Sequence, residues 1–125
     1  MENKYYTPSI EEFFVGFEYE EEDSLEDNLW IKRTLDFNYG WLEIPQDFAN
    51  DKRVKYLDSS DIEELGFIFE EQVAGKITFK YTKNNFIELH KLYTTILILN
   101  NGRTIFEGFI KNKSELIRLL GWLNV

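Results

Sequence analysis

The pair Asn101-Gly102 constrains the fold of this chain more than any other feature. It separates an apolar run at residues 96–99 from a β-rich run at residues 104–110. Asparagine and glycine both tolerate a positive φ, which the type I′ turn of a two-residue hairpin requires. The second half of the chain therefore predicts antiparallel strands joined by tight turns, with a weaker second turn signal at Asn84-Asn85.

Further strands are expected wherever short aromatic and β-branched runs lie between polar segments. Such runs occupy residues 13–20, 29–35, 41–44, 54–57, 67–70 and 76–81, and one long strand is predicted at residues 86–99. The lysines interleaved with aromatics at residues 79–83 are interpreted as marking an edge strand that is protected against aggregation. Together these strands predict an antiparallel meander.

Two helices are expected beside the strands. Ser60 and Glu63 fit a capping box at the start of a short middle helix, with Asp58 and Ser59 as alternative caps. Asn112 should cap a C-terminal helix. Its apolar stripe comprises Leu116, Ile117, Leu119, Leu120 and Leu123. The predicted fold class is α+β, an antiparallel meander with a short middle helix and a C-terminal amphipathic helix packed on the sheet, in a single domain over residues 1–125.

Negative charge is concentrated in the leading part of the chain. Residues 1–72 hold 20 Asp and Glu against 6 Lys and Arg, whereas residues 73–125 hold 3 against 8. No lysine or arginine occurs between residues 5 and 31. A negative field repels nucleic acid and attracts basic protein surfaces. We therefore expect a protein partner with a basic surface and no direct contact with nucleic acid.

Several classes of chemistry are not expected. The chain has no cysteine, and a lone histidine cannot complete a multi-histidine metal site, so His90 is interpreted as an ordinary strand residue. The acidic run at residues 20–23 lacks the spacing of an EF-hand loop. A carboxylate-pair hydrolase would need a cleft for which a small domain has little room. We expect no enzyme activity, metal or cofactor, no membrane segment, and a cytoplasmic location.

The acidic stretch provides the candidate binding site. Its carboxylates would steer a basic partner and its aromatics would anchor it. The predicted partner-binding residues are Glu18, Tyr19, Glu20, Glu21, Glu22, Asp23 and Trp30. An interpretation of equal weight is that these acids only keep a small protein soluble. An alternative function is a nucleotide-binding or sponge protein in which Trp30, Tyr39 and Trp41 stack on a base while Arg103 or Lys111 meets the phosphate.

Three segments of the chain carry a resemblance: residues 5–13 with 16–20, residues 54–58 with 61–67, and residues 104–116. They resemble small, mostly uncharacterised proteins of phages and mobile elements from Bacteroidota hosts. The resemblance implies a phage product in a bacterial cytoplasm and supplies no catalytic residues. From that setting and the charge we expect a non-enzymatic inhibitor or adaptor of anti-defence type, such as an anti-CRISPR protein acting on an RNA-guided nuclease. A phage structural or assembly part is a third alternative.

Overall fold

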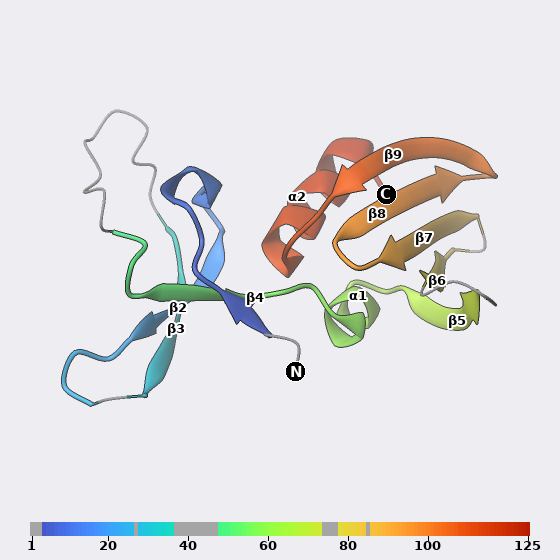
Figure 1. Cartoon of the computed structure of the whole chain (residues 1–125). Coiled ribbons are helices and arrows are strands. Elements are labelled where there is room, and N and C mark those ends of the chain that lie inside the picture. Colours follow the sequence, from blue (N-terminus) through green and yellow to red (C-terminus); the bar gives the residue numbers. More distant parts are fainter. Residues whose placement is uncertain (1–3, 27, 37–47, 74–77, 85) are drawn as a thin grey trace. The chain divides into compact units, whose positions relative to one another are not determined.

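The computed structural model describes residues 4–26, 28–36, 48–73, 78–84 and 86–125, in two compact units, Met1–Tyr56 and Leu57–Val125 (Figure 1). Each unit has its own antiparallel sheet and its own apolar core, so the fold is α+β and mostly sheet, as predicted. The expected single domain over residues 1–125 stays a prediction. No helix of the described residues is long and apolar enough to span a membrane.

Unit 1 is a four-stranded sheet in the order β1-β4-β2-β3. Its elements are β1 (Tyr5–Tyr6), the 3-10 helix η1 (Ile10–Glu12), β2 (Glu18–Glu22), β3 (Trp30–Thr34) and β4 (Lys52–Lys55). The strand expected at residues 13–20 begins only at Glu18, because Gly16 turns the chain with a φ of 95°. The strand predicted at residues 41–44 lies outside the described residues.

The core of unit 1 lies on one face of this sheet. Phe17, Leu35 and Val54 are buried there. The Phe13 ring packs edge-on against Phe17 and Tyr19, with ring centroids 4.9 and 5.3 Å apart. Side chains alternate between the two faces along a strand. The strand residues next to those of the core face therefore point to the opposite face, which we call the open face.

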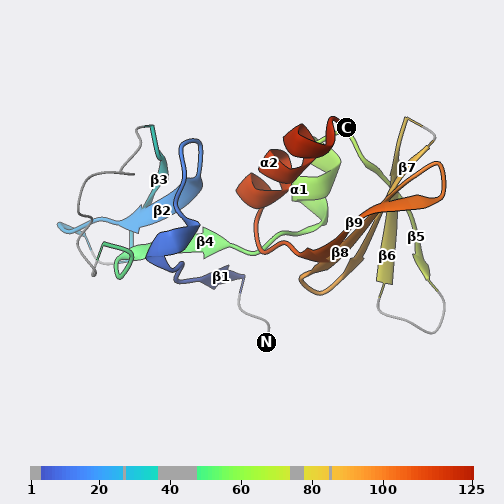
Figure 2. The ribbon, with the colours of Figure 1, turned by 90° about the horizontal axis from the view of Figure 1, so that it is seen from above.

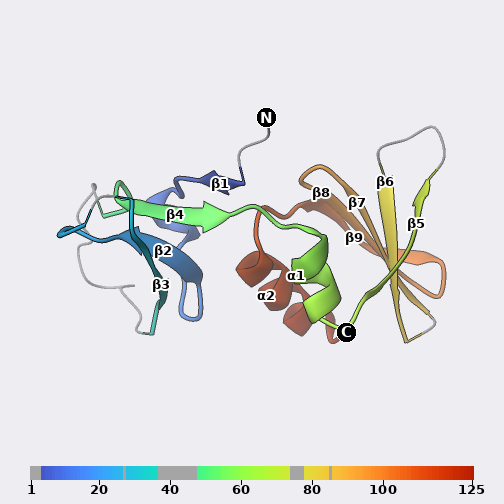
Figure 3. The same cartoon turned by 90° about the horizontal axis from the view of Figure 1, so that it is seen from below.

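Unit 2 is a five-stranded antiparallel meander with its strands in chain order. Its elements are α1 (Ser59–Glu64), β5 (Ile68–Val73), β6 (Thr78–Lys83), β7 (Ile87–Leu92), β8 (Thr95–Asn100), β9 (Arg103–Phe109) and α2 (Lys113–Leu123). Both helices lie on the same side of the sheet (Figures 2 and 3). Ile62 of α1 and Leu116 of α2 are fully buried in one cluster with Tyr81, Leu89 and Ile98 of the sheet.

The structure confirms some of the turns and caps predicted for unit 2 and corrects others. Asn101 and Gly102 have φ values of 54° and 79°, which confirms the predicted hairpin. The prediction of a single long strand at residues 86–99 is wrong. β7 ends at Leu92, and the chain reverses at Tyr93-Thr94, where Tyr93 has a φ of 55°. The middle helix begins at a different capping box from the one expected, since Asp58 accepts from the Asp61 amide at 3.0 Å.

Two further expectations about unit 2 are corrected. Residues 79–83 do not form an edge strand, because β6 pairs with β5 on one side and β7 on the other. The edge strands are β5 and β9, and each contains a register shift at a bulge. Ile117 does not join the buried stripe of α2 but is 45% exposed, whereas Leu116, Leu119 and Leu120 are buried.

Candidate functional site

Strand geometry divides the acidic residues of β2 between the two faces of the unit 1 sheet. Tyr19 and Glu21 lie on the core face, with Phe17 before them. Glu18, Glu20 and Glu22 lie on the open face. The seven predicted partner-binding residues therefore do not form a single surface.

Glu21 holds a buried lysine in place. Lys52 is 5% exposed, and its Nζ lies 3.1 Å from Glu21 Oε1, while Arg33 Nε lies 3.2 Å from Glu21 Oε2. Burial alone lowers the pKa of Lys52, but hydrogen bonds to Asp51 and Glu21 outweigh that effect and raise the pKa above its usual value. Glu21 is therefore paired within unit 1, and its predicted role in partner binding stays a prediction.

Glu20 is also paired, on the open face. Its Oε2 lies 3.1 Å from Arg53 Nε. The Arg53 guanidinium carbon lies 3.8 Å from the centre of the Tyr5 ring and 4.2 Å from the centre of the Trp30 ring. Both rings supply cation–π contacts, so Trp30 anchors Arg53 within unit 1. Lys32 stands opposite Glu20 in the register, which adds a second positive side chain to this face.

Three acids that form no ion pair with a described residue lie where β2 turns into β3. Glu22 and Glu26 are exposed, and Asp23 lies between them in the loop. Leu25 is 95% exposed and Leu29 is 42% exposed. We call these five residues the acidic hairpin tip; Figure 1 shows the loop extending beyond the ends of both strands.

The backbone of the acidic hairpin tip is held by local hydrogen bonds. Asp23 Oδ1 accepts from the Leu25 amide at 2.9 Å, and the Asp23 amide donates to the Leu29 carbonyl at 2.8 Å. The Leu29 amide donates to the Glu26 carbonyl at 3.4 Å, and Asn28 supplies the positive φ, 66°, that closes the loop. Leu25, whose side chain is 95% exposed, follows Asp23 and precedes Glu26 in this loop.

Sequence reasoning identified Glu22, Asp23 and Trp30 in this region but missed Leu25, Leu29 and Glu26. A signal was available, because Leu25 is a single apolar residue inside an otherwise polar loop. A single exposed apolar side chain is ordinary on a protein surface, but here two of them, Leu25 and Leu29, lie in one acidic loop.

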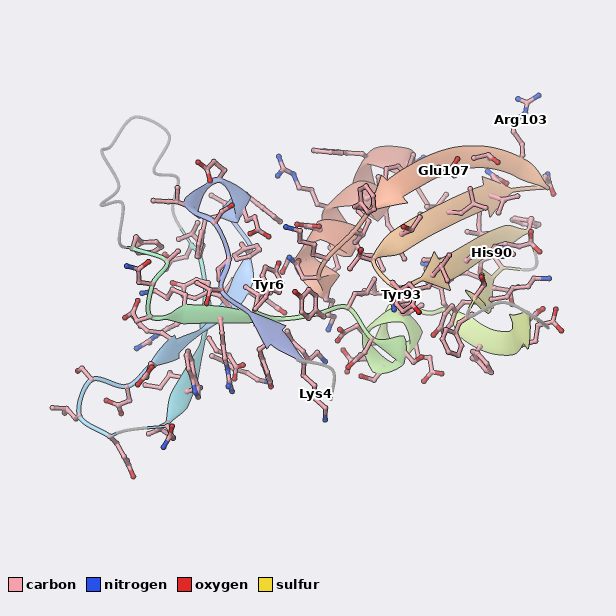
Figure 4. The ribbon with its side chains drawn as sticks, viewed as in Figure 1. Lys4, Tyr6, His90, Tyr93, Arg103 and Glu107 are labelled. Atoms are coloured by element: carbon pink, nitrogen blue, oxygen red, sulfur yellow. The ribbon has the colours of Figure 1, made fainter. Side chains whose placement is uncertain are left out.

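The nucleotide-site alternative stays a prediction. Tyr39 and Trp41 lie outside the described residues. Arg103 begins β9, and Lys111 follows its last residue by two positions, so about 25 Å of extended chain separates the two. Figure 4 shows Arg103 at the far end of the hairpin, pointing away from the sheet. A single phosphate would therefore contact Arg103 or Lys111, and not both.

His90, the one histidine of the sequence, lies on β7. Its Nε2 is buried without a hydrogen-bond partner in the described part of the chain and lies 4.0 Å from Glu88 Oε2. Within the described residues, no group of three His, Cys, Asp or Glu side chains is arranged to hold a metal ion. No protein-family model, curated protein or solved structure matches the chain.

Proposed function

We propose that this chain is a non-enzymatic binding protein that inserts its acidic hairpin tip into a basic groove of another protein. Leu25 carries the proposal, because it is 95% exposed and stands between exposed acids. The exposed leucine gives the acidic hairpin tip apolar surface that a partner can bury. The surrounding carboxylates select a positively charged site around that leucine.

The distribution of charge between the two units also supports binding to a basic surface. Unit 1 holds 14 Asp and Glu against 6 Lys and Arg, a net of −8, whereas unit 2 holds 9 against 8, a net of −1. Nearly all of the net charge therefore belongs to the unit that carries the tip. Such a field accelerates encounter with a basic surface, and salt screens it.

A groove that binds nucleic acid is the natural target of an acidic loop, because its lysines and arginines are placed to contact successive phosphates. The carboxylates of Glu22, Asp23 and Glu26 would replace phosphates, and Leu25 would occupy apolar surface between those cations. With the phage-type resemblance of the sequence, the proposed partner is an RNA-guided nuclease of a Bacteroidota host, and the chain would act as its inhibitor.

The test measures binding of the purified chain to such a nuclease, with and without its guide RNA, by fluorescence anisotropy. The tip variant Glu22→Lys/Glu26→Lys should weaken binding at least tenfold. The matched control Glu63→Lys/Glu71→Lys changes the total charge equally, at exposed acids of unit 2. If both double variants lost affinity equally, the loss would reflect net charge alone, and the proposed docking of the acidic hairpin tip would be wrong.

The apolar anchor is tested separately. Leu25→Ser leaves every charge in place and should weaken binding several-fold with an unchanged salt dependence. The control is Val15→Ser, which removes another exposed aliphatic side chain, 54% exposed, from unit 1. If Leu25→Ser binds as tightly as the unmodified chain, the loop does not enter the partner.

A further inference from the structure

The outer face of the unit 2 sheet, which is the face opposite the two helices, is apolar along β8. Ile96 and Ile98 are buried beneath the helices. Leu97 and Leu99 alternate with them, so they point to the outer face, where both are half-buried. Both helices described in unit 2 lie on the other side (Figures 2 and 3). A strand that is apolar on both sides is typical of a sheet covered on both faces, so the outer side of β8 suits a partner.

Two large apolar side chains continue this surface at one end of β8. Thr95 pairs with Leu92 of β7 on one side and with Phe109 of β9 on the other. Leu92 is 40% exposed and Phe109 is 75% exposed. An apolar surface therefore runs along β8 and ends between two exposed side chains. We call it the outer apolar strip, and it comprises Leu92, Leu97, Leu99 and Phe109.

Carboxylates outnumber cations on the same face of the described strands. Lys80 Nζ lies 3.0 Å from Glu88 Oε1 and 3.7 Å from Glu70 Oε2. The hydrogen bond to Glu88 is the largest cause of a raised pKa at Lys80, and the charges of Glu70 and Glu71 add to it. Glu107 is exposed and forms no hydrogen bond or ion pair with a described residue. One lysine is thus shared by three carboxylates, a fourth has no cation, and the face keeps an excess of negative charge.

Two of these carboxylates stand on opposite sides of the outer apolar strip. Glu88 of β7 is opposite Leu99, and Glu107 of β9 is opposite Leu97; Figure 4 shows Glu107 on its strand. Neighbouring strands lie about 4.8 Å apart, so the lines of β7 and β9 are about 10 Å apart. An α-helix with its side chains is about 10–12 Å across. A helix lying along β8 would therefore cover the leucines while its two flanks pass beside Glu88 and Glu107.

We propose that the outer face of unit 2 binds a basic amphipathic helix of another protein, seated along β8. Lysines or arginines on the two flanks of that helix pair with Glu88 and Glu107, and its apolar side covers the outer apolar strip. β8 has six residues, which span about 20 Å, the length of about 13 residues of helix. One helix on three strands is a small interface, so we expect a dissociation constant of roughly 10–100 μM.

The test adds a synthetic peptide to the full chain, labelled for NMR. The peptide has about 14 residues, with leucines repeating every three or four residues and lysines on the remaining positions. It should shift backbone amide resonances of β7, β8 and β9. A second peptide, with the same leucines and with glutamate in place of lysine, should bind about tenfold more weakly. Equal binding of the two peptides, or no binding of the lysine peptide, would overturn the proposal.

Single substitutions locate the contact on the outer face. Phe109→Ser should raise the dissociation constant of the lysine peptide about tenfold, because it removes apolar surface that the helix buries. Trp122→Ser is its matched control, since Trp122 is 72% exposed but lies on α2. Glu107→Lys should raise the constant about fivefold, and Glu63→Lys, at an exposed acid of α1, is the control for charge. Equal effects within either pair would contradict the proposed seat.

Charge reversal at the acidic hairpin tip separates the two surfaces. Glu22→Lys/Glu26→Lys leaves the outer face unaltered, so the lysine peptide should still shift the β7, β8 and β9 resonances with the same dissociation constant. If the shifts were confined to unit 1, or if this variant lost the shifts of unit 2, the outer face would not be the binding surface.

Discussion

Replacing Glu21 by glutamine should destabilise unit 1, although Glu21 belongs to the acidic run that sequence alone assigns to partner binding. The substitution keeps the shape of the side chain and removes its charge. Lys52, which is 5% exposed, would then retain Asp51 as its remaining ion-pair partner. Partial loss of a buried ion pair is costly because the remaining charge stays desolvated.

The magnitude follows from the geometry. At the 3.1 Å separation of Lys52 Nζ and Glu21 Oε1, the gross attraction is about 5 kcal/mol at an effective dielectric constant of ~20. Two features reduce it, since the Glu21 side chain is 33% exposed and Asp51 still contacts the lysine. We expect a net loss of about 2 kcal/mol in the free energy of unfolding. Glu22→Gln, at an exposed site, should change stability by less than about 0.5 kcal/mol.

Urea denaturation followed by circular dichroism measures both variants. Glu21→Gln should lower the midpoint with an unchanged slope. The pKa of Lys52 is raised in the folded chain. The ion pairs of Lys52 therefore contribute their full stabilisation at pH values below the pKa of the unfolded chain. That contribution is lost as the pH rises through the pKa of the folded chain. The difference between the unmodified chain and Glu21→Gln should therefore shrink above about pH 10.5. Equal midpoints at neutral pH would refute a structural role for Glu21.

Two further predictions concern unit 2. Tyr93→Asn should stabilise the chain by about 1 kcal/mol in thermal or urea unfolding, because Tyr93 has a φ of 55° that asparagine adopts more readily; a destabilised variant would contradict the strain. Asn112→Ala should cost about 1 kcal/mol, since the buried Asn112 side chain accepts from the Glu115 amide at 2.8 Å. Asn112→Asp should recover most of that loss, which an effect of side-chain volume alone would not allow.

The fold was predictable where turn chemistry is local. Asn101-Gly102 specifies its own reversal, and Asn112 specifies the start of α2, because a few adjacent residues satisfy the geometry by themselves. The reversal at Tyr93-Thr94 has no such signal. Its position is set by the pairing of β7 with β8 across the sheet, and this pairing forces a tyrosine into a conformation that it disfavours.

The sequence predicted where the acidic residues lie along the chain, but not which of them are paired with cations inside unit 1. Strand alternation from Phe17 already places Tyr19 and Glu21 on the core face, so that part could have been read from the sequence. The cations that pair with Glu20 and Glu21 could not be predicted from the sequence. Arg53 and Lys52 come from β4, some thirty residues further along the chain. An acidic run therefore indicates a charged surface only after the cations on neighbouring strands are known.

Docking of the acidic hairpin tip combines an electrostatic and an apolar contribution, and salt should separate the two. The electrostatic contribution weakens steeply as salt rises. Glu22→Lys/Glu26→Lys should therefore lower both the affinity and its dependence on salt, whereas Leu25→Ser should lower the affinity alone. If Leu25→Ser also flattened the salt dependence, the division of roles between the carboxylates and the leucine would be wrong.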